Sequence, residues 1–133
     1  MAEPGRLIVA STRLPVTVSK KGERWVAQAR GGCLVTALKP VAEERGFEWI
    51  GWSGAAVPEP ERTSVNRILS EHGCRPVHLS KQEVEGFYAG FSNGVLWPLF
   101  HGMPDLSKYS RVDWRAYTRV NEMFADEIAR TAR

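Results

Sequence analysis

The sequence predicts an α/β fold, in which strands alternate with helices. Apolar, β-branched and aromatic residues fill two short segments, at positions 6–11 and 47–52, as expected for strands of a sheet that is covered on both faces. Between them, apolar residues of segment 34–44 recur at the i, i+3, i+4 and i+7 positions of one helix face. Sheets of this class bind ligands beyond the carboxyl ends of their strands, so the residues that follow each strand are the first candidates for a site.

The N-terminal part of the chain is predicted to contain a strand and a hairpin. The strand at 6–11 ends before Pro15, which stops the strand and starts a loop. Segments 16–18 and 24–27 then flank a polar stretch that contains Gly22, a pattern typical of a β-hairpin. This hairpin precedes a pair of adjacent glycines.

The glycine pair, Gly31 and Gly32, separates the hairpin from a helix predicted over Leu34–Glu44, within which Pro40 should introduce a kink or an early end. Glycine accepts positive φ and lets a ligand approach the backbone closely. The N-terminus of a helix favours a bound anion through its free N–H groups and its dipole. Two interpretations therefore stay open at this point: a phosphate or diphosphate site, and a plain turn between strand and helix.

The second half of the chain continues the alternation. The strand at 47–52 is followed by a polar helix near Ser64–His72 and by a third strand over Cys74–Leu79. Ser80 and Glu83 then match a capping box, which predicts the start of a helix.

That helix is predicted to run towards Tyr88 and to break near Gly90. A short apolar segment, 94–101, comes next, and a last helix is predicted from Val112 to the end.

Residues that follow the first two strands, and a later aromatic segment, supply the candidate binding groups. Arg13 lies just beyond the first strand, where it either contacts a phosphate in a bidentate manner or is an ordinary surface residue. Segment 87–101 combines aromatic rings with hydroxyl, amide and imidazole groups, the mixture that binds sugars. Within it, Tyr88 and Trp97 are the candidates because each has a polar group. The alternative is that these aromatic residues form core, which we expect for Phe87, Phe91 and Phe100.

Composition and charge exclude several classes of function. The 133 residues are 43% hydrophobic and 25% charged, as in soluble globular proteins, and the net charge of +3 is too small and scattered to indicate nucleic-acid or membrane binding. Cys33 and Cys74 lack metal-ligand spacing, and reduced thiols are the simplest interpretation. No apolar run reaches the length of a membrane span, and no signal-peptide pattern is present. We therefore expect a cytoplasmic protein.

Five segments, taken together and in this order, resemble the N-terminal part of the trehalose-6-phosphate synthases, which are retaining glycosyltransferases of family 20 with the two-domain GT-B architecture. The most specific is the run Phe-Ser-Asn-Gly-Val-Leu-Trp-Pro-Leu-Phe-His at its end. The segments are 6–16, 31–38, 49–54, 87–101 and 114–125. The resemblance covers essentially the whole chain and implies a partial Rossmann-like N-terminal domain, with the hairpin as an insertion before the glycine loop.

The resemblance also implies an activity and a role for each candidate residue. These enzymes transfer glucose from UDP-glucose to glucose 6-phosphate with retention of configuration, and the resemblance implies no metal and no cofactor. By the same resemblance, Arg13, Tyr88 and Trp97 would bind the acceptor, glucose 6-phosphate. Gly31 and Gly32 would lie near the diphosphate of the donor, UDP-glucose. We assign no catalytic residue within this chain.

Two residues depart from the family pattern. The family usually has Ser-Asn-Arg where this chain has Ser11-Thr12-Arg13, and Thr12 cannot replace both groups of an amide. Cys33 stands between Gly32 and Leu34, where the family usually continues directly from glycine to leucine. Either the loop is one residue longer or Cys33 replaces the second glycine.

Members of this family are much longer than 133 residues. We therefore expect a single partial domain over residues 1–133, without the C-terminal nucleotide-binding domain, and no synthase activity from the isolated chain unless a partner supplies the remainder. Two alternatives stay open: a related glycosyltransferase or pseudo-glycosyltransferase with another acceptor, and a non-catalytic sugar-phosphate-binding module. Apolar surface left uncovered would favour self-association.

Overall fold

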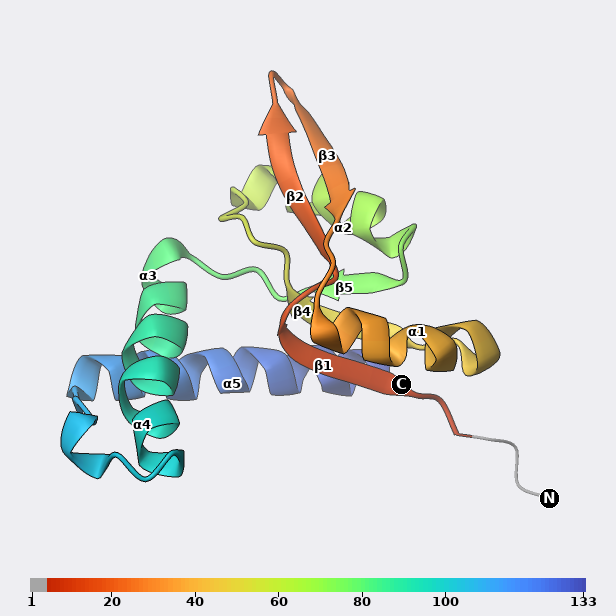
Figure 1. Ribbon diagram of the computed structural model, residues 1–133. Coiled ribbons are helices and arrows are strands. Elements are labelled where there is room, and N and C mark those ends of the chain that lie inside the picture. The colour runs from red at the N-terminus through yellow and green to blue at the C-terminus, as the bar shows by residue number, and fades with distance from the viewer. Residues whose placement is uncertain (1–4) are drawn as a thin grey trace. The chain divides into compact units, whose positions relative to one another are not determined.

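The computed structural model describes residues 5–133, and the chain divides into two compact units. The first consists of the described residues up to His78 together with Asp126–Arg133, and the second consists of Leu79–Ala125. Figure 1 shows the elements of both, coloured by position in the chain. The predicted domain spans residues 1–133, and its residues 1–4 lie outside the described part of the chain.

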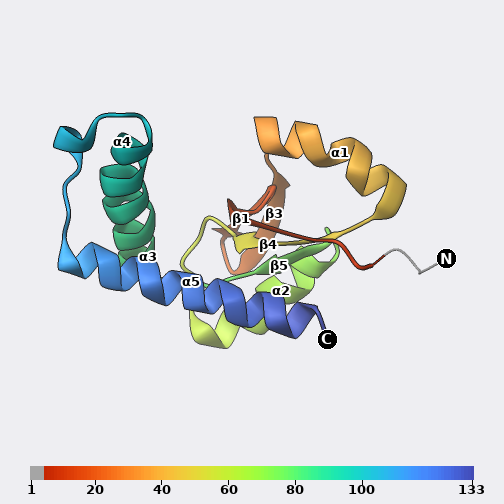
Figure 2. The ribbon, with the colours of Figure 1, turned by 90° about the horizontal axis from the view of Figure 1, so that it is seen from below.

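A parallel sheet forms the centre of the first unit. Its strands β1 (Ile8–Arg13), β4 (Glu48–Trp52) and β5 (Cys74–Pro76) are neighbours in the order β1-β4-β5. Figure 2 shows α1 (Cys33–Arg45) on one face of this sheet and α2 (Arg62–Ser70) on the other. The prediction of an α/β fold with a parallel sheet is therefore confirmed.

Strand β1 ends two residues later than predicted. Arg13 still pairs with Trp52 of β4, across an irregularity that follows Ala10. Arg13 is thus the last residue of the strand rather than a residue of the loop. The β4–β5 ladder ends at Pro76, so β5 is shorter than the predicted strand.

The core of the first unit is made by side chains from the strands, from the connection between β1 and β2, from α2 and from the loop that precedes α2. These residues pack into one cluster with partly buried contributions from α1, including Val35 and Leu38. The buried members are Leu14, Val16, Val18, Trp49, Val57, Val65, Leu69 and Cys74. Burial raises the pKa of the Cys74 thiol to about 11, so this thiol stays protonated and inert near neutral pH.

Helix α1 continues to Arg45, five residues past Pro40, so the prediction of an early end is wrong. Pro40 cannot donate to the carbonyl of Thr36, but Thr36 is exposed and water can satisfy that oxygen. No residue of α1 is fully buried.

Strands β2 (Val16–Lys21) and β3 (Arg24–Ala29) form an antiparallel pair around Gly22, whose positive φ of 62° suits a glycine. The pair is held to the short 3-10 helix η1 (Glu59–Glu61) by one carboxylate. Lys20 Nζ lies 2.9 Å from Glu61 Oε1, and the indole N–H of Trp25 donates to Glu61 Oε2. These two donors, Lys20 first, lower the pKa of Glu61. The hairpin is therefore anchored near its tip, since Lys20 and Trp25 pair one position before the last pair of the ladder.

The second unit is helical. The capping box at Ser80 is confirmed: its side chain accepts from Glu83 N, and the Glu83 side chain accepts from Ser80 N. Helix α3 (Lys81–Val84) leads directly into a π-helical segment, η2 (Glu85–Leu96), and then into α4 (Trp97–Phe100), as Figure 1 shows. A short 3-10 helix, η3 (Pro104–Leu106), precedes α5 (Arg111–Thr131).

The predicted break at Gly90 is wrong, because Gly90 permits close packing instead of ending the helix. A Cβ on Gly90 would lie 2.4 Å from the carboxyl carbon of Asp113, and one on Gly86 would lie 2.5 Å from Ala116 Cβ. The two glycines, four residues apart, therefore let η2 approach α5 closely.

The aromatic residues of this segment divide between core and surface. Phe87 and Phe91 are buried, as predicted, and both rings contact that of Tyr117. Phe100 is 77% exposed, so its prediction as a core residue is wrong. It lies at the end of α4, a four-residue helix with a single buried side chain, Pro98. Of the helices in the described part of the chain, none has the length and apolar character needed to span a membrane.

Replacing Gly51 tests the contact between the exit of β1 and the middle of β4. A Cβ at Gly51 would lie 2.7 Å from the carbonyl oxygen of Ser11 and 3.1 Å from Leu14 N, both of them backbone atoms. Because backbone cannot move aside cheaply, we expect Gly51→Ala to lower the free energy of unfolding by about 2 kcal/mol or more in urea titrations. Gly5→Ala is the control, since a Cβ there meets nothing within 4 Å. Equal stability of the two variants would contradict this packing.

Candidate functional site

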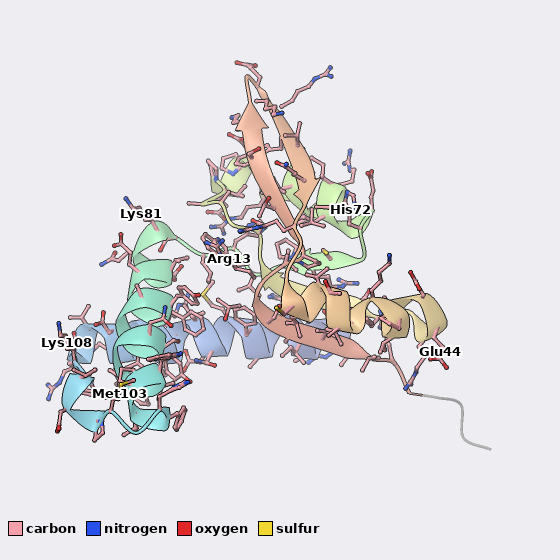
Figure 3. All side chains as sticks on the ribbon, in the orientation of Figure 1. Arg13, Glu44, His72, Lys81, Met103 and Lys108 are labelled. Carbon is pink, nitrogen blue, oxygen red and sulfur yellow. The ribbon has the colours of Figure 1, made fainter. Side chains whose placement is uncertain are left out.

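The root of the hairpin brings two predicted site segments together in the first unit. Val16, the first residue of β2, pairs with Ala29, the last residue of β3. One residue further out, Arg30 N donates to the carbonyl of Pro15 at 2.7 Å. The chain enters the hairpin from Arg13 and leaves it towards Gly31, so both lie at this root; Figure 3 labels Arg13 there.

Arg13 is exposed, and its guanidinium lies over the ring of Trp52, 5.0 Å from the ring centroid. Its backbone is fixed on both sides: Ser11 Oγ donates to the Arg13 carbonyl at 2.7 Å, and Leu14 N donates to the Trp52 carbonyl at 2.9 Å. A guanidinium stacked on an aromatic face keeps the N–H donors at its edge free. Among residues 5–133, no carboxylate forms a salt bridge with Arg13. Its charge is therefore available to an anion.

The structure shows the backbone conformation and surroundings of the glycine pair, Gly31 and Gly32. Neither Gly31 nor Gly32 adopts left-handed φ, so the interpretation through positive φ is wrong. A Cβ at either position would meet nothing within 4 Å, and both residues are exposed. Gly32 is the N-cap of α1 and offers no side-chain cap, which leaves the first N–H groups of the helix without a side-chain partner. Neither packing nor backbone strain therefore requires glycine at these two positions.

Cys33 is the first residue of α1, with an exposed, free thiol. Thr36 N donates to the Gly32 carbonyl at 3.0 Å, so the helix begins regularly at this point. The turn between β3 and α1 consists of Arg30, Gly31 and Gly32. Cys33 therefore belongs to the helix and not to the turn.

In the second unit, the π-helical segment sets the direction of Tyr88 and Trp97. The Trp97 N–H donates to the carbonyl of Ser92, five residues earlier, and Ser92 Oγ donates to the carbonyl of Phe87 at 2.7 Å. Hydrogen bonds of the i→i+5 type put about 4.4 residues in a turn. Residues nine apart, such as Tyr88 and Trp97, therefore return to the same face. In an α-helix, with 3.6 residues per turn, they would lie on opposite faces.

Both side chains of this face are accessible. Tyr88 is 45% exposed, and among the described residues its hydroxyl has no hydrogen-bond partner. Trp97 is 51% exposed, and its indole ring stacks with the imidazole of His101, with ring centroids 4.0 Å apart. A phenol with a free hydroxyl and an open indole suit a polar ligand that has an apolar face.

The site residues thus fall into two groups. Arg13, Gly31 and Gly32 lie at the hairpin root of the first unit, and Tyr88 and Trp97 lie on one helix face of the second unit. Sequence reasoning missed the position of Arg13 over the Trp52 ring, although Arg13 follows one predicted strand and Trp52 ends another. It also missed the π-helix, for which the glycines at positions 86 and 90 were the available signal. In the described part of the chain, no cluster of three or more His, Cys, Asp or Glu side chains could hold a metal ion.

The sequence model of glycosyltransferase family 20 matches residues 5–133. The chain belongs to glycosyltransferase family 20. Among its relatives is the bifunctional trehalose-6-phosphate synthase/phosphatase of Thermoproteus tenax, with 47% identity over 96% of this chain. Another is the 56 kDa subunit of the UDP-forming α,α-trehalose-phosphate synthase of Saccharomyces cerevisiae, with 40% identity over 96% of this chain.

Solved structures of the family resemble this chain in fold as well as in sequence. A UDP-forming synthase from Burkholderia xenovorans in complex with glucose 6-phosphate has a TM-score of 0.66 and 26% identity over 97% of this chain. A protein from Escherichia coli bound with UDP-2-fluoro glucose has a TM-score of 0.64 and 27% identity over 96% of this chain. The chain spans 18% and 26% of the two curated relatives, and 26% and 25% of the two solved chains.

His78, just past β5, predicts a pH dependence of stability. Burial, with a contribution from Arg62, lowers the pKa of His78 to about 4. The imidazole is therefore neutral, with Nε2 2.7 Å from Asn66 Oδ1, and Nδ1 is buried without a partner that could accept a proton from it. Because the unfolded chain, with a histidine pKa near 6.5, binds the proton first, stability falls as pH decreases from about 6.5 towards 4.

We expect the 133-residue chain to lose about 1–2 kcal/mol of unfolding free energy between pH 7 and pH 5, measured by urea titration. His78→Gln should flatten this dependence, because it removes the titrating group and keeps a donor towards Asn66. His72→Gln is the control, since His72 is exposed on the surface. The same slope in wild type and His78→Gln would contradict the assignment.

Proposed function

We propose that this chain forms the N-terminal part of a UDP-forming α,α-trehalose-6-phosphate synthase, which transfers glucose from UDP-glucose to the anomeric hydroxyl of glucose 6-phosphate with retention of configuration. The observation that carries the proposal is the alignment of 96% of the chain, at 47% and 40% identity, with synthases of Thermoproteus tenax and Saccharomyces cerevisiae. Solved relatives bind glucose 6-phosphate and a UDP-glucose analogue.

The donor diphosphate is assigned to the glycine pair. The open surroundings of Gly31 and Gly32 admit a ligand to the backbone, and the first N–H groups of α1 have no side-chain cap. Negative charge is stabilised at such a helix N-terminus. During transfer, the same groups would stabilise charge that develops on the departing diphosphate.

The acceptor is assigned to Arg13, Tyr88 and Trp97. Arg13 offers free guanidinium donors to an anion, and Tyr88 offers a free hydroxyl. Trp97 offers an apolar ring face to the C–H surface of a hexose.

Both units are assigned to the Rossmann-like N-terminal domain of a GT-B enzyme, with β2–β3 as an insertion before the glycine loop. Glycosyl transfer requires donor and acceptor to be held together and the leaving group to be stabilised. We assign the groups that complete substrate binding and stabilise the leaving group to the part of the synthase that this chain does not span. We also assign the protein to the cytoplasm. Exposed apolar residues such as Phe100 and Leu106 are the surface through which the chain would associate with that part or with itself.

One residue favours a second candidate, a related glycosyltransferase with a different acceptor. Thr12 replaces an asparagine of the family pattern and lies half-buried next to Arg13, at the end of β1. A hydroxyl does not supply the separate carbonyl oxygen and NH₂ group of an amide, so the polar contacts of the acceptor would change here. Offering other hexose phosphates in the assay below distinguishes the two.

A chimera tests the proposal. Residues 5–133 replace the corresponding segment of the 56 kDa subunit from Saccharomyces cerevisiae, and trehalose 6-phosphate is measured after addition of UDP-glucose and glucose 6-phosphate. We expect the folded chimera to form the product and the isolated 133-residue chain to form none, because the chain alone lacks the groups that complete the reaction. Catalytic turnover by the isolated chain, or a folded chimera active only with another acceptor, would contradict the proposal.

Tyr88→Phe in the chimera tests the acceptor assignment. A hydrogen bond to a charged group contributes about 1.5–3 kcal/mol, so its loss should raise KM for glucose 6-phosphate about tenfold or more and leave KM for UDP-glucose unchanged. The matched control is Tyr109→Phe, because Tyr109 is 66% exposed in the same unit and contacts Phe91 edge-on. Equal effects of the two variants would remove Tyr88 from the site.

A further inference from the structure

His101 contacts Trp97 in two independent ways. The imidazole and indole rings are stacked, with an interplanar angle of 19° and centroids 4.0 Å apart. In addition, His101 Nδ1 lies 2.7 Å from the carbonyl oxygen of Trp97, within hydrogen-bond distance. Since a carbonyl can only accept, Nδ1 carries the proton in this contact.

The end of α4 explains why this contact forms. The last carbonyls of a helix lack partners within the helix, and the Trp97 carbonyl accepts from both the backbone N and the side-chain Nδ1 of His101. Gly102 follows with a left-handed φ of 72°, and Met103 N then donates to the Pro98 carbonyl at 2.9 Å. The helix therefore ends at His101, whose ring is directed back over Trp97.

We propose that His101 is a positioning residue that holds the Trp97 ring in the orientation that receives the acceptor sugar. The inference rests on the proposed function, in which Trp97 binds glucose 6-phosphate. His101 covers part of the indole and leaves Trp97 51% exposed, so the ring is fixed and still accessible. A ring that is ordered before binding loses less rotational freedom when the sugar stacks on it, and affinity rises accordingly.

Two measurements on the 133-residue chain test this role, with His101→Ala as the main variant. The first is the NMR order parameter of the Trp97 indole N–H, assigned with a Trp97→Phe variant, which reports picosecond to nanosecond motion of the ring. The second is the Kd for glucose 6-phosphate, from an NMR titration. We expect His101→Ala to lower the order parameter and to raise Kd about three- to tenfold.

Two further variants sharpen the comparison. His101→Phe keeps a stacked ring and should retain the order parameter, with Kd within about twofold of the wild type. His72→Ala removes an exposed histidine of the first unit, labelled in Figure 3, and should change neither quantity.

An unchanged order parameter in folded His101→Ala would overturn the inference. If that variant does not fold, His101→Gln removes the ring and keeps a donor, and an unchanged order parameter there would overturn it equally. A lower order parameter in His101→Ala, together with no affinity of the wild-type chain for glucose 6-phosphate, would leave His101 as the residue that orders Trp97 and would contradict the acceptor assignment instead. The two failures are therefore distinguishable.

Discussion

The hydrogen bond from Arg30 N to the carbonyl of Pro15 closes the root of the hairpin, and the candidate site of the first unit depends on it. Without this closure, the loop after β1 and the turn before α1 would be separate pieces of surface, since the fourteen residues of the hairpin, 16–29, lie between them. The antiparallel ladder of β2 and β3 converts that separation in sequence into proximity at one end. The anchor at Glu61 then limits how far the hairpin can swing about its root.

In each unit, an exposed candidate side chain lies against an aromatic ring. Arg13 lies over the indole of Trp52, and Trp97 stacks on the imidazole of His101. Long or large side chains on a surface lose several rotamers when they bind, and a stacking partner removes part of that cost in advance. Among residues 5–133 no salt bridge occupies Arg13, and Trp97 stays half-exposed. Both arrangements combine exposure with order.

Features that depend on local pattern were predictable from the sequence. Apolar segments marked the strands β1 and β4, and the Ser80–Glu83 capping box marked the start of α3, because a few neighbouring residues decide each of them. The break predicted at Gly90 failed for the opposite reason: the requirement for glycine comes from Asp113, twenty-three residues later in the chain. The π-helix that aligns Tyr88 with Trp97 contains both Gly86 and Gly90, the glycines that pack against α5. Phe100 was misplaced because hydrophobicity alone does not say which side chains of a short helix find a partner.

The structure distinguishes glycines that packing requires from glycines that it does not require, a difference that the sequence does not show. Gly51, Gly86 and Gly90 have no room for a Cβ, so their own chain requires them. Gly31 and Gly32 have room on every side and ordinary φ values, so neither packing nor backbone strain demands glycine there. What their missing side chains leave open is the start of α1, where backbone N–H groups without a side-chain cap can receive an anion. Cys33 already lies inside the helix, so the turn that the glycine pair forms leaves the start of α1 exposed.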